Sequence, residues 1–425
     1  MSRRLPARIA LAGLALVLAA CGSTPTSAPT AAPTAAPTTT ADAPTTVPTP
    51  SGTPRPAPEV VLPEIRAAVS DIRGLQPQGD VEPTVIDEAT LRQNLEAEFD
   101  AEYTAEELAV TEDLYATLGL LPPDSSLREL QLDLLGGQVA GYYSPDRDEL
   151  FVVSRSGGIG PVEWATYAHE FTHQLQDQHF DLGTFGLDAT DQTDRALAAL
   201  SLIEGDATAA QSAWMQTALT PEELGEIVRA SVDPAALEVL RRAPAILRET
   251  ALFPYREGFA FVSAILAGGG YPAVDAAYAD PPASTEQVIH PDKYASREAP
   301  VEVTIPVGLA EALGAGWTEA GRDTLGEATL RTWLREGGLE GAQAGLAAAG
   351  WGGDRAVLLR GPDGALGVAL VTEWDSAADA DEFANAARTA SAELVAGARI
   401  VVLGERRVAI AFGDEAEALA VALAE

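Results

Sequence analysis

The stretch PVEWATYAHEFTHQLQDQHF, residues 161–180, decides how the rest of the chain is interpreted. Pro161 is favoured as the first residue of a helix, and Glu163 falls in the first turn, so the stretch is predicted to be helical. His169 and His173 lie four residues apart and therefore project from one face of that helix. Two neutral imidazoles placed in this way can bind a single zinc ion, and Glu170 is positioned to take a proton from metal-bound water.

This H-E-x-x-H pattern resembles the motif of the zincin group of zinc peptidases. Together with L-I-E-G-D-A at 202–207 and two further stretches at 253–262 and 281–294, it makes the chain similar to a poorly characterised group of bacterial gluzincin-like lipoproteins. The similarity extends over about residues 85–300. It implies a zinc metallopeptidase, a hydrolase, in which Glu170 is the general base. The alternative interpretation is a pair of ordinary histidines on an amphipathic helix.

Zinc requires a third protein ligand, and Glu204 is the preferred candidate. Leu197, Leu200 and Glu204 are spaced three and four apart on one helical face, and a carboxylate on an apolar stripe is costly unless it is paired or bound to metal. Gly205 lets another helix approach closely. Two histidines on one helix and a glutamate on the next form the gluzincin arrangement. Either Asp206 or Asp177 could orient a ligand imidazole through a hydrogen bond.

His179 is the second candidate, because it lies ten residues after His169, as in metzincins. The glycine of the metzincin motif is replaced by Gln176, a good helix former, so the helix is expected to continue. On a continuous helix, His179 is turned about 240° away from His173. We therefore expect His179 to miss the metal.

A tyrosine or histidine side chain stabilises the tetrahedral oxyanion in many zinc peptidases. The tentative candidates are Tyr255 and His290, and Tyr294 is a weaker one. His290 lies in a proline-bounded loop, where its alternative role is to tie the loop to the core.

The residues before the predicted zinc helix form two kinds of structure. Helical patterns dominate 59–135, with a capping box at Thr104 and Glu107 and a cap at Asp124 or Ser125. Residues 138–143 and 149–153 are predicted to form a β-hairpin. The second strand, 149–153, is expected to pair with extended substrate as an added edge strand.

Residues 1–20 have the features of a secretory signal, with three arginines ahead of an apolar run from Ile9 to Ala20. The run ends in Leu-Ala-Ala-Cys21, which resembles the lipobox of bacterial lipoproteins and implies a lipid on the Cys21 thiol. A plain signal peptide is the alternative. Residues 21–58 are predicted to be a disordered linker rich in proline, threonine and alanine. No later segment offers 18 uninterrupted apolar residues, so no transmembrane helix is expected. The predicted location is the cell membrane, lipid-anchored and facing outside the cytoplasm.

Composition limits the partners of the chain. It has 27 basic and 63 acidic residues, a formal net charge of −36, so phosphate backbones would be repelled and nucleic-acid binding is disfavoured. One cysteine in 425 residues rules out a disulfide framework and any cysteine-built metal site. The expected partners are a peptide or protein substrate and, through the anchor on Cys21, a membrane.

The expected fold class is α+β. Residues 59–350 are predicted to form a mainly helical zincin-like catalytic domain with a small β-hairpin or sheet. Residues 351–425 are predicted to form a separate small domain with the order ββαββα, an antiparallel sheet with helices on one face.

The sequence therefore predicts a lipid-anchored extracytoplasmic peptidase whose zinc ion is held by His169, His173 and Glu204. A non-catalytic cell-envelope lipoprotein that uses a peptidase-like fold for binding or scaffolding stays open as the alternative. A zinc-storing or zinc-sensing lipoprotein is disfavoured, because the chain has only four histidines and no clustered metal-binding tract.

Overall fold

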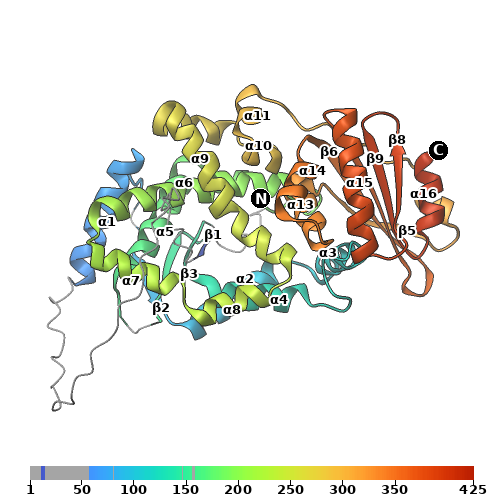
Figure 1. Cartoon of the computed structure of the whole chain (residues 1–425). Helices are drawn as coiled ribbons and strands as arrows, with labels where there is room; N and C mark the ends of the chain where they lie inside the picture. Colours follow the sequence, from blue (N-terminus) through green and yellow to red (C-terminus); the bar gives the residue numbers. More distant parts are fainter. Residues whose placement is uncertain (1–10, 15–56, 80, 146, 156–157) are drawn as a thin grey trace, which may run out of the picture.

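The structure is a computed structural model that describes residues 11–14, 57–79, 81–145, 147–155 and 158–425 (Figure 1). Its described elements are mixed helices and strands with two separate sheets, which confirms the α+β class. Figure 1 places the C-terminal sheet at one end of the molecule and α1, α5 and α6 towards the other.

The elements before residue 300 surround the first sheet. The strands are β1 (Leu11–Leu14), β2 (Pro83–Ile86), β3 (Val139–Ser144) and β4 (Glu149–Val153). The helices are α1 (Pro58–Arg73), α2 (Glu88–Glu102), α3 (Ala105–Thr117), α4 (Leu127–Gln138), α5 (Pro161–Phe180), α6 (Thr193–Ala218), α7 (Pro221–Ser231), α8 (Pro234–Arg242), α9 (Ala245–Ala279), α10 (Thr285–Ile289) and α11 (Pro291–Ser296).

The first sheet has the strand order β1-β3-β4-β2. The β3–β4 hairpin is antiparallel, and β2 adds to β4 in parallel. Since β4 lies between two partners, the expectation that strand 149–153 forms a free edge is wrong. On the other side of the hairpin, β3 pairs with β1, so β3 is also an inner strand in this structure. The hairpin precedes α5, which packs against it through Tyr167, Phe171 and their neighbours.

Local sequence signals determine most helix ends. Thr104 and Glu107 form the expected capping box at the start of α3. At α4 the cap is Ser126, whose side chain accepts a hydrogen bond from the Glu129 amide, so the predicted cap at Asp124 or Ser125 is wrong by one or two positions. Asp124 instead has a positive φ of 62°, which places it in the turn before the helix.

Long helix α9 is the one described helix with the length and apolar composition of a membrane span. It is interrupted at Gly270, where φ is 66°, and its first half packs against α6. The predicted absence of a transmembrane helix stays a prediction. Cys21 and the other residues of the predicted lipobox and linker up to 56 lie outside the described residues.

The C-terminal sheet contains five antiparallel strands in the order β5-β6-β7-β9-β8. These strands are β5 (Thr318–Asp323), β6 (Trp351–Arg360), β7 (Leu366–Trp374), β8 (Arg399–Leu403) and β9 (Arg407–Gly413). The accompanying helices are α12 (Leu309–Leu313), α13 (Gly326–Glu336), α14 (Gly341–Ala348), α15 (Ala377–Leu394) and α16 (Ala416–Ala424). Because β5 belongs to this sheet, the C-terminal unit begins upstream of the predicted boundary at 351.

Helices cover both faces of this sheet, so the expectation of helices on one face is wrong. Side chains alternate along each strand. In β7, Val368 and Leu370 join the cluster of α13, α14 and α15, whereas Ala369 and Val371 face the other way, towards Leu419 and its neighbours in α16. A sheet with two apolar faces needs a layer on each.

The C-terminal sheet is tied directly to the start of α6. Asp323, the last residue of β5, accepts hydrogen bonds from the backbone and side chain of Thr193, and Thr324 accepts one from the Asp194 amide. Lys293 in α11 forms ion pairs with Glu286 in α10 and with Asp375, the residue directly after β7. The C-terminal sheet is therefore joined to the preceding helices by partly buried polar contacts.

Candidate metal centre

His169, His173 and Glu204 converge at the crossing of α5 and α6. The Nε2 atom of His169 lies 3.0 Å from a Glu204 carboxylate oxygen and 3.0 Å from the Nε2 atom of His173. The His173 Nε2 atom is 3.4 Å from the same carboxylate oxygen. All three residues are buried. Their ligand atoms lie within 4.8 Å of one another, and two imidazoles with a carboxylate are a donor set that suits zinc.

The charges of this cluster are coupled. Burial raises the pKa of Glu204, but interaction with His173 and hydrogen bonds with both imidazoles lower it to about 2. Burial works to lower the pKa of His173, and the Glu204 carboxylate raises it to about 9. Burial lowers the pKa of His169. The cluster thus carries an ionised carboxylate beside one neutral imidazole.

Gln176 fixes which nitrogen of His173 faces the cluster. Its amide nitrogen has two acceptors, the Ile203 carbonyl and the Asp206 carboxylate, each at 3.0 Å. Its amide oxygen therefore faces His173 and accepts a hydrogen bond from Nδ1 at 2.8 Å. Metal binding would require His173 to lose the proton that the Glu204 carboxylate favours, and the Nε2 lone pair would then be directed at the candidate metal position. Gln176 lies three residues after His173, so the sequence alone could have indicated that the two side chains meet on one face of the helix.

Asp206 acts on the cluster through Gln176 and not by direct contact with a ligand. Its carboxylate also accepts a hydrogen bond from the Tyr278 hydroxyl at 2.9 Å and pairs with the Arg73 guanidinium at 2.9 Å. Arg73 is fully buried and also pairs with Asp275 at 2.7 Å. A chain of polar contacts thus runs from α1 to His173. Asp177, the other sequence candidate, bonds the Tyr143 hydroxyl and the Leu182 amide instead.

Glu170 lies on α5 beneath β3 and is fully buried. The strand passes so close to the helix that a β-carbon on Gly141 would lie 2.5 Å from the Thr166 methyl carbon and 3.3 Å from Cγ of Glu170. Only glycine fits this approach. Gly141 therefore brings the backbone of β3 next to the candidate general base, a role that the sequence alone did not indicate.

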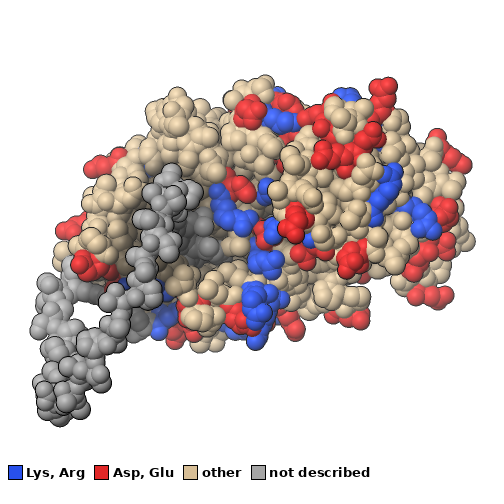
Figure 2. Space-filling model, viewed as in Figure 1, with Lys and Arg blue, Asp and Glu red and all other residues tan. Residues whose placement is uncertain are grey.

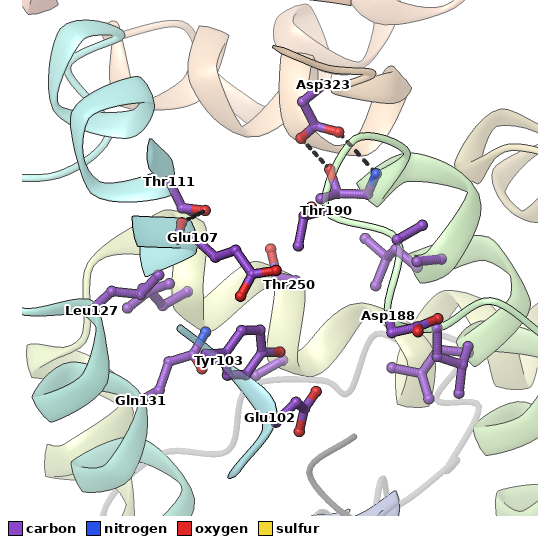
Figure 3. Close-up of a pocket in the computed structure, with 18 of the residues that line it drawn as sticks. Glu102, Tyr103, Glu107, Thr111, Leu127, Gln131, Asp188, Thr190, Thr250 and Asp323 are labelled. Carbon is purple, nitrogen blue, oxygen red and sulfur yellow. Dashed lines mark hydrogen bonds between the residues drawn. The ribbon is translucent and has the colours of Figure 1, made fainter. Parts of the chain in front are cut away.

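Tyr255 is the oxyanion candidate that the structure brings to the cluster. Its ring lies against the His169 ring, with centroids 6.0 Å apart and an angle of 29° between planes. Together with Glu204, it lines a cavity of about 420 Å³ whose wall comes mainly from α3, α4, α6 and α9 (Figure 3). Tyr255 is supplied by α9, the helix that packs against α6.

The other candidates lie elsewhere. His290 is half-exposed between α10 and α11, its Nε2 atom is 3.1 Å from a Glu327 carboxylate oxygen, and this hydrogen bond raises its pKa. It is not among the described residues that line the cavity. The Tyr294 hydroxyl donates to the Asp280 carbonyl at 2.9 Å. His179 Nε2 lies 2.8 Å from the Gln76 carbonyl oxygen, on the outside of α5, as expected for a continuous helix.

Two glycines allow α9 to pack closely against α6 next to Glu204. A β-carbon on Gly205 would lie 2.2 Å from the Gly258 carbonyl oxygen, and one on Gly258 would lie 2.3 Å from the Ser201 carbonyl oxygen. The helices therefore touch backbone to backbone, one residue after the candidate ligand, in agreement with the role expected for Gly205.

Comparisons with known proteins bear only on the C-terminal part. A family model described as a domain of unknown function (DUF8575) matches residues 312–424. None of the curated proteins and none of the solved structures matches the chain. The DUF8575 match spans the second sheet from just before β5 into α16 and does not include the candidate metal centre. The zincin resemblance therefore stays a prediction from the motifs.

Proposed function

We propose that the chain is a zinc-dependent peptidase with His169, His173 and Glu204 as metal ligands. The observation that carries this proposal is the convergence of these three buried side chains on one point beside Glu170. Zinc, when bound there, supplies Lewis-acid chemistry that polarises a carbonyl and acidifies water. We also propose that the helices and the first sheet before residue 300 form a zincin-like catalytic domain.

The protein side chains have separate tasks in this proposal. The Glu170 carboxylate takes the proton of the attacking water and then delivers it to the nitrogen of the departing amine. The Tyr255 phenol donates a hydrogen bond to the oxygen that gains negative charge. Gln176 holds the His173 imidazole in one orientation and one tautomer. The backbone of β3 lies next to Glu170 and supplies the groups along which an extended peptide pairs.

The first experiment measures zinc per chain by mass spectrometry in the parent and in Glu204→Ala. The expected result is about one zinc per chain in the parent, as for a site with three protein ligands, and its loss in the variant. Cleavage of a peptide library is then compared in the parent and in Glu170→Gln, which should bind zinc and lose about 10²- to 10⁴-fold in rate. A parent without zinc after reconstitution would favour the non-catalytic envelope lipoprotein.

The location of this peptidase is a further part of the proposal. The signal at residues 1–20 and the lipobox before Cys21 support a lipid anchor on the outer side of a membrane. Metabolic labelling with a radioactive fatty acid should mark the parent, and Cys21→Ser should lose the label and leave the membrane fraction.

A further inference from the structure

The cavity beside the candidate metal centre is large enough to hold more than one side chain of a bound peptide. Its volume of about 420 Å³ falls within the range of about 300–1,000 Å³ that is typical of pockets for whole small ligands. Most of its wall is aliphatic and comes from α3, α4, α6 and α9, including Leu114, Leu134, Leu197 and Ala251. Because the cavity reaches Glu204 and Tyr255, apolar groups next to a reacting bond could occupy it.

The charged residues of the cavity wall are mostly acidic. Five lining residues carry carboxylates and one carries a guanidinium; these are Glu102, Glu107, Asp188, Glu204, Asp323 and Arg322. Arg322 is also paired with Glu319 at 2.8 Å. Figure 3 shows Glu107 directed from the α3 wall towards Thr250 on α9, with Glu102 below it. Glu204 belongs to the histidine cluster, and Asp323 is bonded to Thr193. Glu102, Glu107 and Asp188 therefore form the acidic rim, which favours occupants that are apolar and positively charged.

The basic groups on the neighbouring surface do not offset this rim. Figure 2 shows lysine and arginine side chains gathered near the middle of the viewed face, interleaved with acidic ones. Over α8 and α9, Arg241 pairs with Glu238, and Arg256 pairs with Glu249 at 2.9 Å. Glu238 is shared with Arg242, and Glu249 is shared with Arg248 and Arg335, so this surface keeps an excess of positive charge. None of these arginines is among the described residues that line the cavity.

The edge of the first sheet supplies a place for an extended backbone. In the structure, the outer edge of β3 pairs antiparallel with Leu11–Leu14 of the same chain, with Leu11 opposite Tyr143 and Gly13 opposite Gly141. These four residues belong to the predicted signal peptide, whose removal would leave the β3 edge unpaired. An unpaired edge is a template for another strand. A chain bound in the same direction would run its N-terminal residues towards Pro145, which also lines the cavity.

We infer that the β3 edge and the cavity together bind one class of peptide, an extended segment in which an apolar run is accompanied by positive charge. Secretory leader peptides have this composition. In the direction of Leu11–Leu14, the apolar run lies along β3 and enters the cavity near Pro145. The basic residues that precede the run face the carboxylates of the cavity rim. The inference rests on the proposed function, since it names the substrate class of that site.

The test measures binding and not turnover. The protein is the processed chain from residue 21 onward carrying Glu170→Gln, and the probe is a fluorescent synthetic peptide with the sequence of residues 1–20. Two altered peptides are compared with it. In one, the three arginines are replaced by glutamine; in the other, the leucines of the apolar run are replaced by serine. Each alteration should weaken binding about tenfold or more, because each removes one of the two recognised features.

Variants of the protein locate the binding. Ala251→Trp fills the cavity and should weaken binding of the parent peptide about tenfold, whereas Ala260→Trp, on an exposed position of the same helix, should not. Asp188→Lys on the exposed rim should weaken binding several-fold in a salt-dependent way, and Asp292→Lys, exposed on α11, should not. Because Asp188 is exposed, its variant keeps the test valid if Ala251→Trp does not fold.

The outcomes separate this inference from the proposed function. Equal binding of all three peptides, or equal binding by Asp188→Lys and the parent, would overturn the inference even if the zinc-loaded parent cleaves a peptide library. If the parent peptide binds selectively but the chain holds no zinc, the peptidase proposal fails and the recognition of apolar, basic peptides stands.

Discussion

Gly205 in α6 and Gly258 in α9 face each other so closely that a β-carbon on Gly205 would lie 2.2 Å from the Gly258 carbonyl oxygen. Glu204 is the residue directly before this contact, and Tyr255 lies three residues before it on α9. The backbone contact therefore determines both the position of the candidate third ligand and the distance of the phenol from the histidines.

Gly205→Ala should destabilise the protein, because neither helix backbone can move without disturbing the packing behind the site. Overpacking costs about 1–3 kcal/mol and occasionally more. The measurement is the free energy of unfolding in urea, together with zinc content. Gly268→Ala in α9 is the matched control, since no atom lies within 4 Å of the β-carbon it would add. A neutral Gly205→Ala would mean that the helices are farther apart than described.

Gln176→Ala should weaken zinc binding while leaving all three ligands in place. Loss of a group that orients a ligand histidine costs about 10- to 100-fold in metal affinity. The measurement is zinc competition with a chromophoric chelator. Gln178→Ala is the control on the same helix, because the Gln178 side chain bonds the Gln78 amide and the Gly79 carbonyl, which belong to the segment after α1. An unchanged affinity in Gln176→Ala would show that His173 is held by its packing alone.

Arg73→Met should be strongly destabilising. It would leave the carboxylates of Asp206 and Asp275 without their buried cation, and breaking a buried ion pair costs about 3–5 kcal/mol. Arg92→Met is the comparison, because the ion pairs of Arg92 with Glu96 and Asp133 are exposed and worth about 0–1 kcal/mol. Chemical denaturation measures both. Similar losses in the two variants would contradict a special role for the buried pair.

Ionisation of the Asp194 carboxyl group should make the folded protein less stable as the pH rises. Burial raises the pKa of Asp194 to about 8, although hydrogen bonds from Thr285 work to lower it. The folded state therefore holds a proton that the unfolded state has already released above about pH 4. The neutral Asp194 carboxyl therefore contributes its full share to the free energy of unfolding below about pH 4. This contribution decreases as the pH rises and is lost by about pH 8.

Asp194→Asn is expected to reduce this loss. The melting temperature is measured from pH 5 to pH 8.5 in the parent, in Asp194→Asn and in the exposed control Asp292→Asn. The parent and the control should fall more steeply towards high pH than Asp194→Asn. If the melting temperatures of all three proteins fall equally with pH, a group other than Asp194 causes the loss of stability. Asp323 is then the next candidate, since burial raises its pKa to about 7.

Local signals in the sequence predicted the elements that carry the candidate site. Pro161 and Glu163 mark the start of α5, and the four-residue spacing of His169 and His173 places both on one face. Glu204 was found because a carboxylate on an apolar stripe needs a partner. The period-two pattern around residues 138–153 located the hairpin to within a residue of its observed bounds.

Long-range packing explains what the sequence did not predict. Strand order depends on β2, which comes from far upstream and makes β4 an inner strand. The roles of Arg73 and Gly141 depend on α1 and β3 lying against α5, which no local pattern indicates. His290 fell outside the cluster for the same reason, since its partner Glu327 belongs to the C-terminal part.

The hydrogen bonds between Thr193 and Asp323 have a consequence for the order in which the protein is assembled. They join residues 130 positions apart, so the N-terminal end of α6 finds its partner only after most of the chain has been synthesised. A nascent or prematurely ended chain of about 310 residues would already contain the two histidines, the glutamate and the general base. Its α6 would nonetheless begin without Asp323 and Thr324. If the chain is the proposed peptidase, its activity would therefore be acquired late in folding, when the C-terminal sheet supplies the partners for the start of the helix that carries Glu204.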